Sequence, residues 1–385
     1  MKIRPKLAAA VTGVAGLAIL VGACSSSGSG TAATGGTGTA TATASASQGV
    51  QQAKEFLAGY MNTPTSLGAL TPLPAKPPAG KHLVLLTNSL PIGVRVGTAA
   101  KAAAAQLGWT LTSISVGSTT ATAVGAFQAA LAMHPAAILD NGEPAALFTT
   151  QLAQAKAEGI PYFEASTADP PTSGVTGIIG GGAYSALVGK ILAAEFVSAS
   201  NGQGNAVFVS LPVFGVVVET QSAFTAAVKQ WCPSCSVKVL NQQLTDVGVN
   251  TPSDVVAFLN ANPSVKYLVF GIGDLITGVP AALQTAGITG ANIMTNAPNE
   301  SDIEAIKSGS ELAAVTYSTD VEGWRLVDLA ARSITGANLA PAFGVLYPTQ
   351  LLTKENAGNA TISTGYFVAP SDYQSQFEKL WKVSS

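Results

Sequence analysis

Two of the three cysteines in the 385-residue chain stand close together, in the stretch WCPSCS at residues 231–236. A Cys-x-x-Cys pair such as Cys232 and Cys235 suits three kinds of chemistry: a dithiol redox couple, half of a metal site, or a structural disulfide. A zinc site needs two further ligands, and a redox pair usually lies at the start of a helix, which lowers the thiol pKa. The compartment and the flanking elements therefore decide between the three.

Other side chains able to do chemistry are scarce. The chain has two histidines, His82 and His134, and only 10% of its residues are charged. It contains neither a Gly-x-Ser-x-Gly elbow nor a phosphate-binding loop, and GIGDLITG (271–278) lacks the glycine spacing of a dinucleotide turn. A net charge of −2 supplies no basic field for nucleic acid. We expect no enzymatic activity, no cofactor, no metal and no nucleic-acid partner.

The N-terminus indicates export. Three basic residues precede an apolar run at 7–21, and small residues lead to Cys24, an order typical of a signal peptide; plain secretion and a retained anchor are the alternatives. VGAC resembles the lipobox of bacterial lipoproteins, which implies that residues 1–23 are removed and Cys24 is acylated. Residues 24–47 carry no charge and no large apolar side chain, so we predict a flexible tether. The protein would work at the extracytoplasmic face of the cell membrane, held there by lipid.

Export also decides the role of the cysteine pair, because disulfides persist outside the cytoplasm. The sequence predicts a helix at 220–230 and a strand at 236–240, so the pair follows the end of a helix rather than starting one. Pro233 prevents the helix from continuing, and the short loop brings the two sulfurs together. We therefore expect a Cys232–Cys235 disulfide that staples this turn, remote from any binding site.

The elements that position the remaining polar groups follow a regular pattern. Short apolar runs alternate with helix-length segments, which is typical of βαβ units and of parallel sheets covered on both faces. Strands are predicted at 82–87, 110–116, 136–140, 161–165 and 177–179, and again at 206–211, 236–240, 267–271, 292–295 and 313–317. Two such series exceed one sheet, so we predict an α/β protein of two doubly wound parallel-sheet lobes. A short helix at 48–61 and a proline-rich lead-in to residue 80 precede them.

Ligands of doubly wound sheets bind beyond the carboxyl ends of the strands. Residues at these ends are our candidates for ligand binding: Asn88, Ser89, Leu90, Ile92, Asn141, Ser166, Phe214, Asp274, Asn296, Tyr317 and Asp320. Several of the polar ones are equally suited to capping a helix, so capping and ligand contact both stay open for them.

Four stretches, in order, carry a resemblance to a known family. They are TNSLPIGVRVGTAAKAAAAQLGW (87–109), AEGIPYFEAS (157–166), VFGIGDLITGVPAALQTAGI (269–288) and DIEAIKSGSELAAVTYSTDVEGWRLV (302–327). Together they resemble the type I periplasmic solute-binding proteins of the ribose-binding branch, over residues 81 to about 355.

The resemblance implies a monomer whose two lobes close on a small molecule and present it to an ABC permease in the membrane. The lobes would be joined by a three-segment hinge, with residues 81–183 and 319–344 in the first lobe and 184–318 and 345–385 in the second. Asp274 becomes the leading candidate for ligand contact, because this family often has an acid there. Glu219 joins the candidates beside the position of a ligand-binding arginine.

Departures from the family concern the ligand. Its sugar-binding members use first-loop aromatics and Asp-Arg pairs, whereas this chain has Ile92-Gly93, Ser166-Thr167, Thr220 and Ala297 at those positions. Their absence favours a less polar ligand: an aromatic or alicyclic acid, a nucleobase-like compound or a short lipid fragment. An atypical sugar site that uses Asn141, Asn296, Asn299 and Trp or Tyr side chains is the alternative.

Two further functions fit the same hinged clamp. The protein could sense a ligand and signal to a membrane receptor instead of delivering cargo. It could also bind no small molecule and act as a protein-interaction module. The sequence does not separate these from transport.

Overall fold

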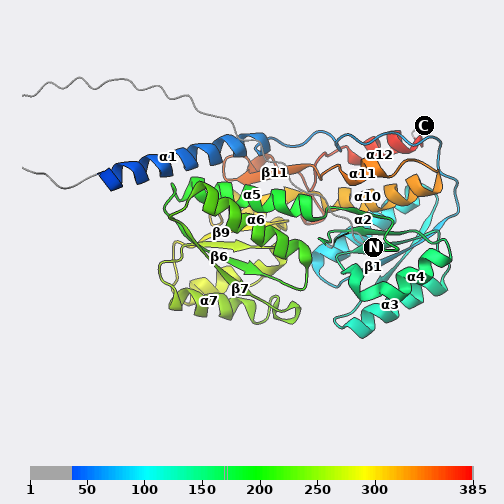
Figure 1. The fold of residues 1–385 in the computed structure, drawn as a ribbon, viewed down its shortest axis with the longest axis horizontal. Helices are drawn as coiled ribbons and strands as arrows, with labels where there is room; N and C mark the ends of the chain where they lie inside the picture. The colour runs from blue at the N-terminus through cyan, green and yellow to red at the C-terminus, as the bar shows by residue number, and fades with distance from the viewer. Residues whose placement is uncertain (1–36, 169, 171, 384–385) are drawn as a thin grey trace, which may run out of the picture. The chain divides into compact units, whose positions relative to one another are not determined.

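The computed structural model describes residues 37–168, 170 and 172–383. The predicted signal peptide, Cys24 and much of the predicted tether lie outside the described residues. From residue 42 onward the chain packs as one unit, which holds a five-stranded and a six-stranded sheet flanked by helices (Figure 1). The prediction of two α/β lobes is therefore confirmed. Within the described part of the chain, no helix has the length and apolar character needed to cross a membrane.

The first lobe is built on five parallel strands in the order β2-β1-β3-β4-β5. β3 is buried along its whole length and β1 along nearly all of it, as expected for a sheet covered on both faces. The elements are β1 His82–Thr87, α2 Pro91–Gln106, β2 Thr110–Ser115, α3 Thr120–Ala132, β3 Ala137–Asn141, α4 Thr149–Ala157, β4 Tyr162–Ala165 and β5 Gly177–Ile179.

The second lobe repeats this strand order, as β7-β6-β8-β9-β10, and adds an edge strand. That strand, β11, runs antiparallel to β10, and the sequence pattern does not predict it. The elements are α5 Gly182–Ala199, β6 Asn205–Ser210, α6 Gly215–Trp231, β7 Ser236–Asn241, α7 Thr251–Ala261, β8 Tyr267–Phe270, α8 Val279–Thr285, β9 Asn292–Asn296, α9 Glu300–Ser308, β10 Ala313–Tyr317 and β11 Thr349–Thr353. Short 3-10 helices occupy Ala145–Phe148 (η2), Leu244–Asp246 (η3), Gly273–Ile276 (η4) and Ala357–Asn359 (η5).

Two helices pack on the lobe opposite to the strand that they follow. α5 follows β5 of the first lobe but packs on α6 of the second, and α10 (Thr319–Ile334) follows β10 of the second lobe but packs on α2 of the first. A glycine allows each pair of helices to approach closely. A Cβ added to Gly189 would lie 2.3 Å from the carbonyl oxygen of Thr220, and one added to Gly323 would lie 2.5 Å from that of Val96. Neither position has room for a side chain, so the two lobes are joined by a reciprocal exchange of helices.

The chain returns to the second lobe once more, between α11 (Ala340–Phe343) and β11. It then forms the hairpin of β12 (Ile362–Ser363) and β13 (Tyr366–Phe367) and ends in α12 (Tyr373–Trp381). We assigned residues 345–385 to the second lobe, but α12 packs against α10 on the first. The reason is its apolar face, because Phe377 and Trp381 are fully buried against Trp324.

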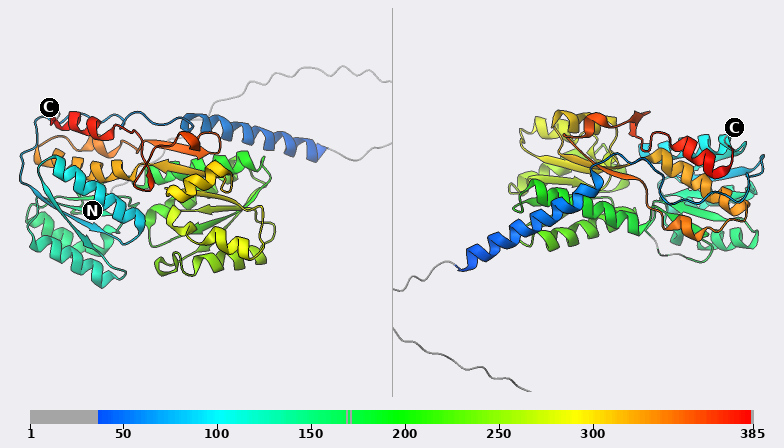
Figure 2. Two further views of the ribbon diagram at one scale, coloured as in Figure 1. Left: turned by 180° about the vertical axis from the view of Figure 1, so that it is seen from behind. Right: turned by 90° about the horizontal axis from the view of Figure 1, so that it is seen from above.

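The N-terminal helix is longer than the sequence indicates. α1 spans Thr37–Leu57 and so begins inside the predicted tether; the 3-10 helix η1 (Ala58–Tyr60) follows it. Its last turns are anchored on the second lobe, where Phe56 packs on Trp231 at 5.6 Å between ring centroids. The lead-in then runs to the first lobe, as Figures 1 and 2 show, and contacts α12 through Leu73, whose amide donates to the carbonyl of Leu380 at 2.8 Å.

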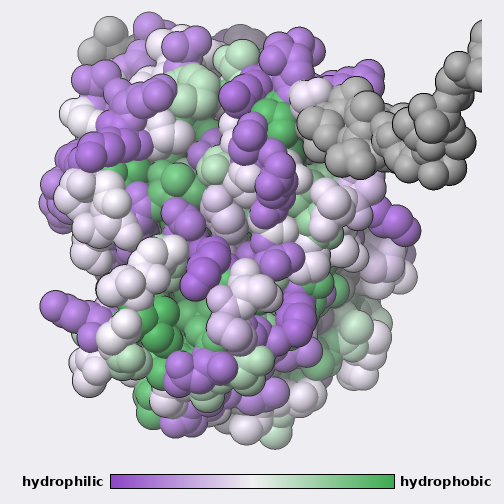
Figure 3. Space-filling model, turned by 90° about the vertical axis from the view of Figure 1, so that its left-hand side faces the viewer, coloured by the Kyte–Doolittle hydropathy of each residue, from purple (hydrophilic) through white to green (hydrophobic). Residues whose placement is uncertain are grey.

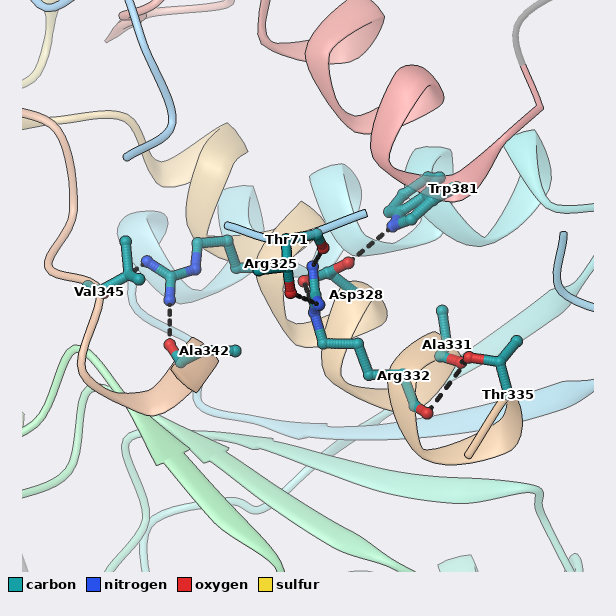
Figure 4. A network of polar contacts seen from close by, with 9 residues as sticks. All are labelled: Thr71, Arg325, Asp328, Ala331, Arg332, Thr335, Ala342, Val345 and Trp381. Atoms are coloured by element: carbon teal, nitrogen blue, oxygen red, sulfur yellow. Dashed lines mark hydrogen bonds and ion pairs between the residues drawn. The ribbon is translucent and has the colours of Figure 1, made fainter. Parts of the chain in front are cut away.

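α10 is buried from Thr319 to Arg332 although it carries several charges. Figure 4 shows how three of the charges are satisfied: Arg332 pairs with Asp328 at 2.7 Å, and Arg325 donates to the carbonyl oxygens of Val345 and Ala342, each at 2.7 Å. On the outer face of the second lobe, polar and apolar side chains are interspersed (Figure 3).

Candidate functional site

A cavity lies between the two lobes, at the carboxyl ends of their parallel strands. Its volume is about 80 Å³, several times the roughly 10–15 Å³ that one water molecule requires. The residues that line it come from both lobes and from the hinge: Asn88, Leu90, Ile92, Gly93, Val96, Asn141, Gly142, Ser166, Gly180, Tyr184, Ser185, Val188, Phe214, Val216, Val217, Thr220, Gly271, Ile272, Asn296, Tyr317 and Glu322. The place is the one at which doubly wound sheets bind ligands.

Asn88 organises the wall formed by the first lobe. It follows β1 and is buried; its Oδ1 accepts from the amide of Leu90 at 3.1 Å, and its Nδ2 donates to the carbonyl of Asn141 at 3.4 Å. A Cβ on Gly93 would lie 2.5 Å from Asn88 Oδ1. The glycine that stands in place of an aromatic residue therefore leaves the space that the side chain of Asn88 occupies.

Ser166 completes this wall after β4. Its backbone has a φ of 56°, in the left-handed region that most side chains avoid. The conformation turns the chain sharply, and the hydroxyl of Ser166 donates to the carboxylate of Glu322 at the hinge. The serine thus links the first lobe to the start of α10.

The wall formed by the second lobe is mostly apolar. Phe214, Val216 and Val217 from the start of α6, with Ile272 after β8, present hydrocarbon to the cavity. Asn296, at the end of β9, adds one polar group. Its Oδ1 is buried and has no hydrogen-bond partner in the structure. An acceptor of this kind is costly unless a ligand or water donates to it.

The hinge contributes aromatic rings and one acid. Tyr184 packs edge-on against Tyr317 at 5.5 Å, and Tyr317 stacks on Tyr347 at 5.2 Å. Glu322 is only 1% exposed, and burial raises its pKa to about 7, although hydrogen bonds from Ser166 and Tyr317 lower it.

Eight of the candidates named from the sequence line the cavity: Asn88, Leu90, Ile92, Asn141, Ser166, Phe214, Asn296 and Tyr317. Four do not: Ser89, Glu219, Asp274 and Asp320. Ser89 is exposed, and Glu219 lies partly buried on α6 beside Gly182.

The two aspartates outside the cavity have other partners. Asp274 receives the amide of Ile92 from the opposite lobe at 3.5 Å, and burial raises its pKa to about 6. Asp320 pairs with Arg95 of α2 at 2.5 Å. Asp274 therefore joins the second lobe to the first, whereas Asp320 ties α10 to α2 within the first lobe, and neither carboxylate lines the cavity.

Sequence reasoning missed Glu322 and Tyr184 as cavity residues. A glutamate in the first turn of a helix is typical of capping, so Glu322 does not stand out from the sequence. Tyr184 lies at the start of α5, where the chain enters the second lobe. Glu322 could have been predicted as a cavity residue from one feature of the sequence: it is a charged residue that comes directly after a predicted hinge segment.

The arrangement suits non-covalent capture. The cavity is lined by both lobes; one wall offers amide and hydroxyl groups, and the other offers apolar surface. Small-molecule sites commonly combine apolar surface with a few placed polar groups in this way.

Comparisons with known proteins agree with this geometry. The model of the periplasmic binding protein domain family matches residues 83–338. A comparison with curated proteins gave no match.

Similar solved structures include three solute-binding proteins. One, from Thermotoga lettingae, belongs to a 5-methylthioribose transporter and is in complex with 5-methylthioribose (17% identity, TM-score 0.65, 77% of this chain and 90% of that chain). Another, from Mycobacterium smegmatis, has bound glycerol (20%, 0.64, 75% and 99%). The third, from Actinobacillus succinogenes, has bound D-allose (16%, 0.63, 73% and 100%).

At these identities the structural likeness shows the fold, and the family match covers most of both lobes. Members of the family are solute-binding proteins, not enzymes. The chain belongs to the periplasmic binding protein domain family and has the two-lobed type I fold.

Proposed function

We propose that the protein captures a small molecule between its lobes and presents it to an ABC-type permease. The observation that carries this proposal is the cavity itself, which draws its walls from both lobes at the carboxyl ends of their strands. A ligand there touches both lobes and so stabilises the closed arrangement over an open one. The ABC transporter proteins with similar folds support the permease as the partner.

We further propose that the protein acts as a lipid-anchored monomer outside the cytoplasm. The support is the sequence VGAC ending at Cys24, after a basic and then an apolar segment. A lipid modification at Cys24 with more than one acyl chain, followed by a tether, would hold the clamp near a permease in the same membrane. The tether is shorter than residues 24–47, since α1 begins at Thr37.

Native mass spectrometry of the full chain, extracted from the membranes of its own host, tests both parts. We expect a mature chain that starts at an acylated Cys24 and holds one small molecule. A chain that retains its N-terminal segment would contradict the anchor. A mature chain that never carries a small molecule would contradict capture and favour a protein-interaction module.

The substitution Asn296→Ala tests whether the side chain of Asn296 binds the captured molecule. Because Asn296 Oδ1 has no partner within the protein, the change breaks no hydrogen bond through that atom. We expect affinity for the captured molecule to fall about tenfold, as losing one hydrogen bond of roughly 1–2 kcal/mol implies. Isothermal titration calorimetry measures this.

The matched control is Asn292→Ala, at the opposite end of β9, where the side chain donates to the carbonyl of Lys266. It should leave affinity unchanged. Equal losses in both variants would mean that the cavity is not the binding site.

Removing the disulfide is expected to have no effect on ligand binding. The structure contains the Cys232–Cys235 bond, at the end of α6 opposite to the cavity; 17 residues of helix separate the two sites by ~25 Å. Changing both cysteines to serine should leave ligand affinity unchanged and lower stability only modestly, because the closed loop is so short. A large loss of affinity in calorimetry would show that the disulfide is needed to maintain the cavity.

A further inference from the structure

Glu322 is the one charged residue among those that line the cavity, all of which the structure describes. It lies in the first turn of α10, directly after the chain passes from the second lobe to the first. Its side chain is almost completely buried. A buried carboxylate at the wall of a binding site needs a physical account, because burying a charge is costly unless it is paired.

The hydrogen-bond partners of Glu322 within the protein are uncharged, and the nearby guanidinium of Arg325 is only a minor cause, the smallest of those that lower its pKa. The hydroxyls of Ser166 and Tyr317 hydrogen-bond to its carboxylate. Arg325, one turn further along α10, directs its guanidinium to two backbone carbonyls instead. No ion pair between described residues includes Glu322.

The cavity wall also contains no cation. Its lining residues include no lysine, arginine or histidine. Arg95, on the bordering helix α2, is held by Asp320 at 2.5 Å. A negatively charged ligand would therefore meet a like charge in a poorly hydrated site, with no lining group to neutralise it.

A second acceptor in the cavity has no hydrogen-bond partner at all among the described residues. Asn296 Oδ1, in the wall of the second lobe, lacks a donor. Glu322 at the hinge and Asn296 on that wall thus both call for hydrogen-bond donors from the ligand. Between them, Phe214, Val216 and Ile272 offer apolar surface.

We propose that Glu322 determines specificity by excluding anions, so that the ligand is a neutral or cationic molecule that presents hydroxyl or amino donors to Glu322 and an apolar part to the second lobe. This inference rests on the proposed capture function and names its ligand class. It removes the aromatic and alicyclic acids that the sequence left open. Burial raises the pKa of Glu322 to about 7, so the side chain is mostly ionised, and able to repel an anion, only above that pH. The affinities in the test are therefore compared at about pH 8.5.

The test uses compounds matched in shape that differ in charge. One series is D-glucose, D-glucosamine and D-glucuronate; the other is cyclohexylmethanol, cyclohexylmethylamine and cyclohexanecarboxylate. Affinities are measured by calorimetry on the mature chain. For wild type, we expect the alcohol or the amine of at least one series to bind at least tenfold more tightly than the carboxylate. If the protein binds the alcohol more tightly, the ligand group that donates to Glu322 is a hydroxyl; if it binds the amine more tightly, that group is an amino group.

Glu322→Gln keeps the size of the side chain and an oxygen to accept from Ser166, so it should fold. We expect it to reduce the discrimination against the carboxylate at least tenfold. Glu195→Gln is the control: burial raises the pKa of Glu195 to about 7 as well, but it lies on α5 outside the cavity lining. It should leave the discrimination unchanged.

Four outcomes overturn the proposal. The first is a carboxylate that binds wild type as tightly as its neutral counterpart; the second is equal discrimination in wild type and Glu322→Gln. If neither series binds, the compound found by native mass spectrometry decides: a neutral or amino compound supports the proposal, whereas an acid, the third outcome, overturns it and leaves capture intact. The fourth outcome is the absence of any bound compound, which overturns the capture function as well.

Discussion

Replacing Trp381 by alanine is expected to lower the free energy of unfolding by about 3–5 kcal/mol. The indole is fully buried and stacks on Trp324, with ring centroids 5.2 Å apart and planes 3° from parallel. Its Nε1 donates to Asp328 Oδ1 at 2.8 Å. The change removes a large apolar contact and also one hydrogen bond of a buried carboxylate, so the two losses add.

Asp328 makes the loss matter beyond α12. Its other oxygen binds Arg332, and Arg332 donates to the carbonyl of Thr71 at 2.8 Å (Figure 4). The lead-in, α10 and α12 are therefore connected through one carboxylate, and a buried network that loses one member is costly.

Urea unfolding of the purified chain measures the effect. Trp381→Phe, which keeps an aromatic ring but loses the donor, should cost about 1–3 kcal/mol. Ser375→Ala, on the exposed face of α12, should stay within roughly 0.5 kcal/mol. A loss below about 1 kcal/mol for the alanine variant would mean that α12 is not part of the folded core.

Stability should also fall as pH rises from about 5 to 8.5. Burial is the largest cause that raises the pKa of four glutamates, to about 7 for Glu143, Glu195 and Glu322 and to about 8 for Glu311. In the unfolded chain these groups ionise near pH 4.3. Between the two pKa values the folded state binds more protons than the unfolded state, so the free energy of unfolding decreases with pH and the loss is complete above the folded-state values.

One unit of pKa shift corresponds to about 1.4 kcal/mol, so the four groups together should lower the free energy of unfolding by at least ~2 kcal/mol over this range. Thermal unfolding at a series of pH values measures the slope. Glu311→Gln should flatten it, since Glu311 is buried and its Oε2 has no partner. A melting temperature that stays constant or rises between pH 5 and 8.5 would contradict the prediction.

The sequence predicts the two sheets well because their strands are short and the central ones are buried on both faces. The strand expected at 82–87 is β1, and the one expected at 177–179 is β5. The positions of α12 and β11 escape prediction for a different reason. Their partners, α10 and β10, are distant in sequence or run in the opposite direction, and periodicity carries no information on either.

The candidate site, too, is predicted in part: local sequence rules locate the cavity but not every side chain that faces it. The rule that ligands lie beyond strand ends is local, and it finds Asn88, Asn141 and Asn296 in the cavity wall. It cannot tell which neighbouring side chain turns inward. Asp274 turns to the amide of Ile92 across the lobes, whereas Glu322 reaches the cavity from a helix start.

The reciprocal exchange of helices between the lobes also determines when each lobe can finish folding during synthesis on the ribosome. The first lobe begins with β1, but α10 and α12, which end at Ile334 and Trp381, cover it. Its core stays open until nearly the whole chain has left the ribosome, unlike a domain that folds as soon as it emerges. The first lobe cannot be completed without these helices, so we expect a fragment ending at residue 318 to leave the first lobe unfolded, while the complete chain forms both lobes.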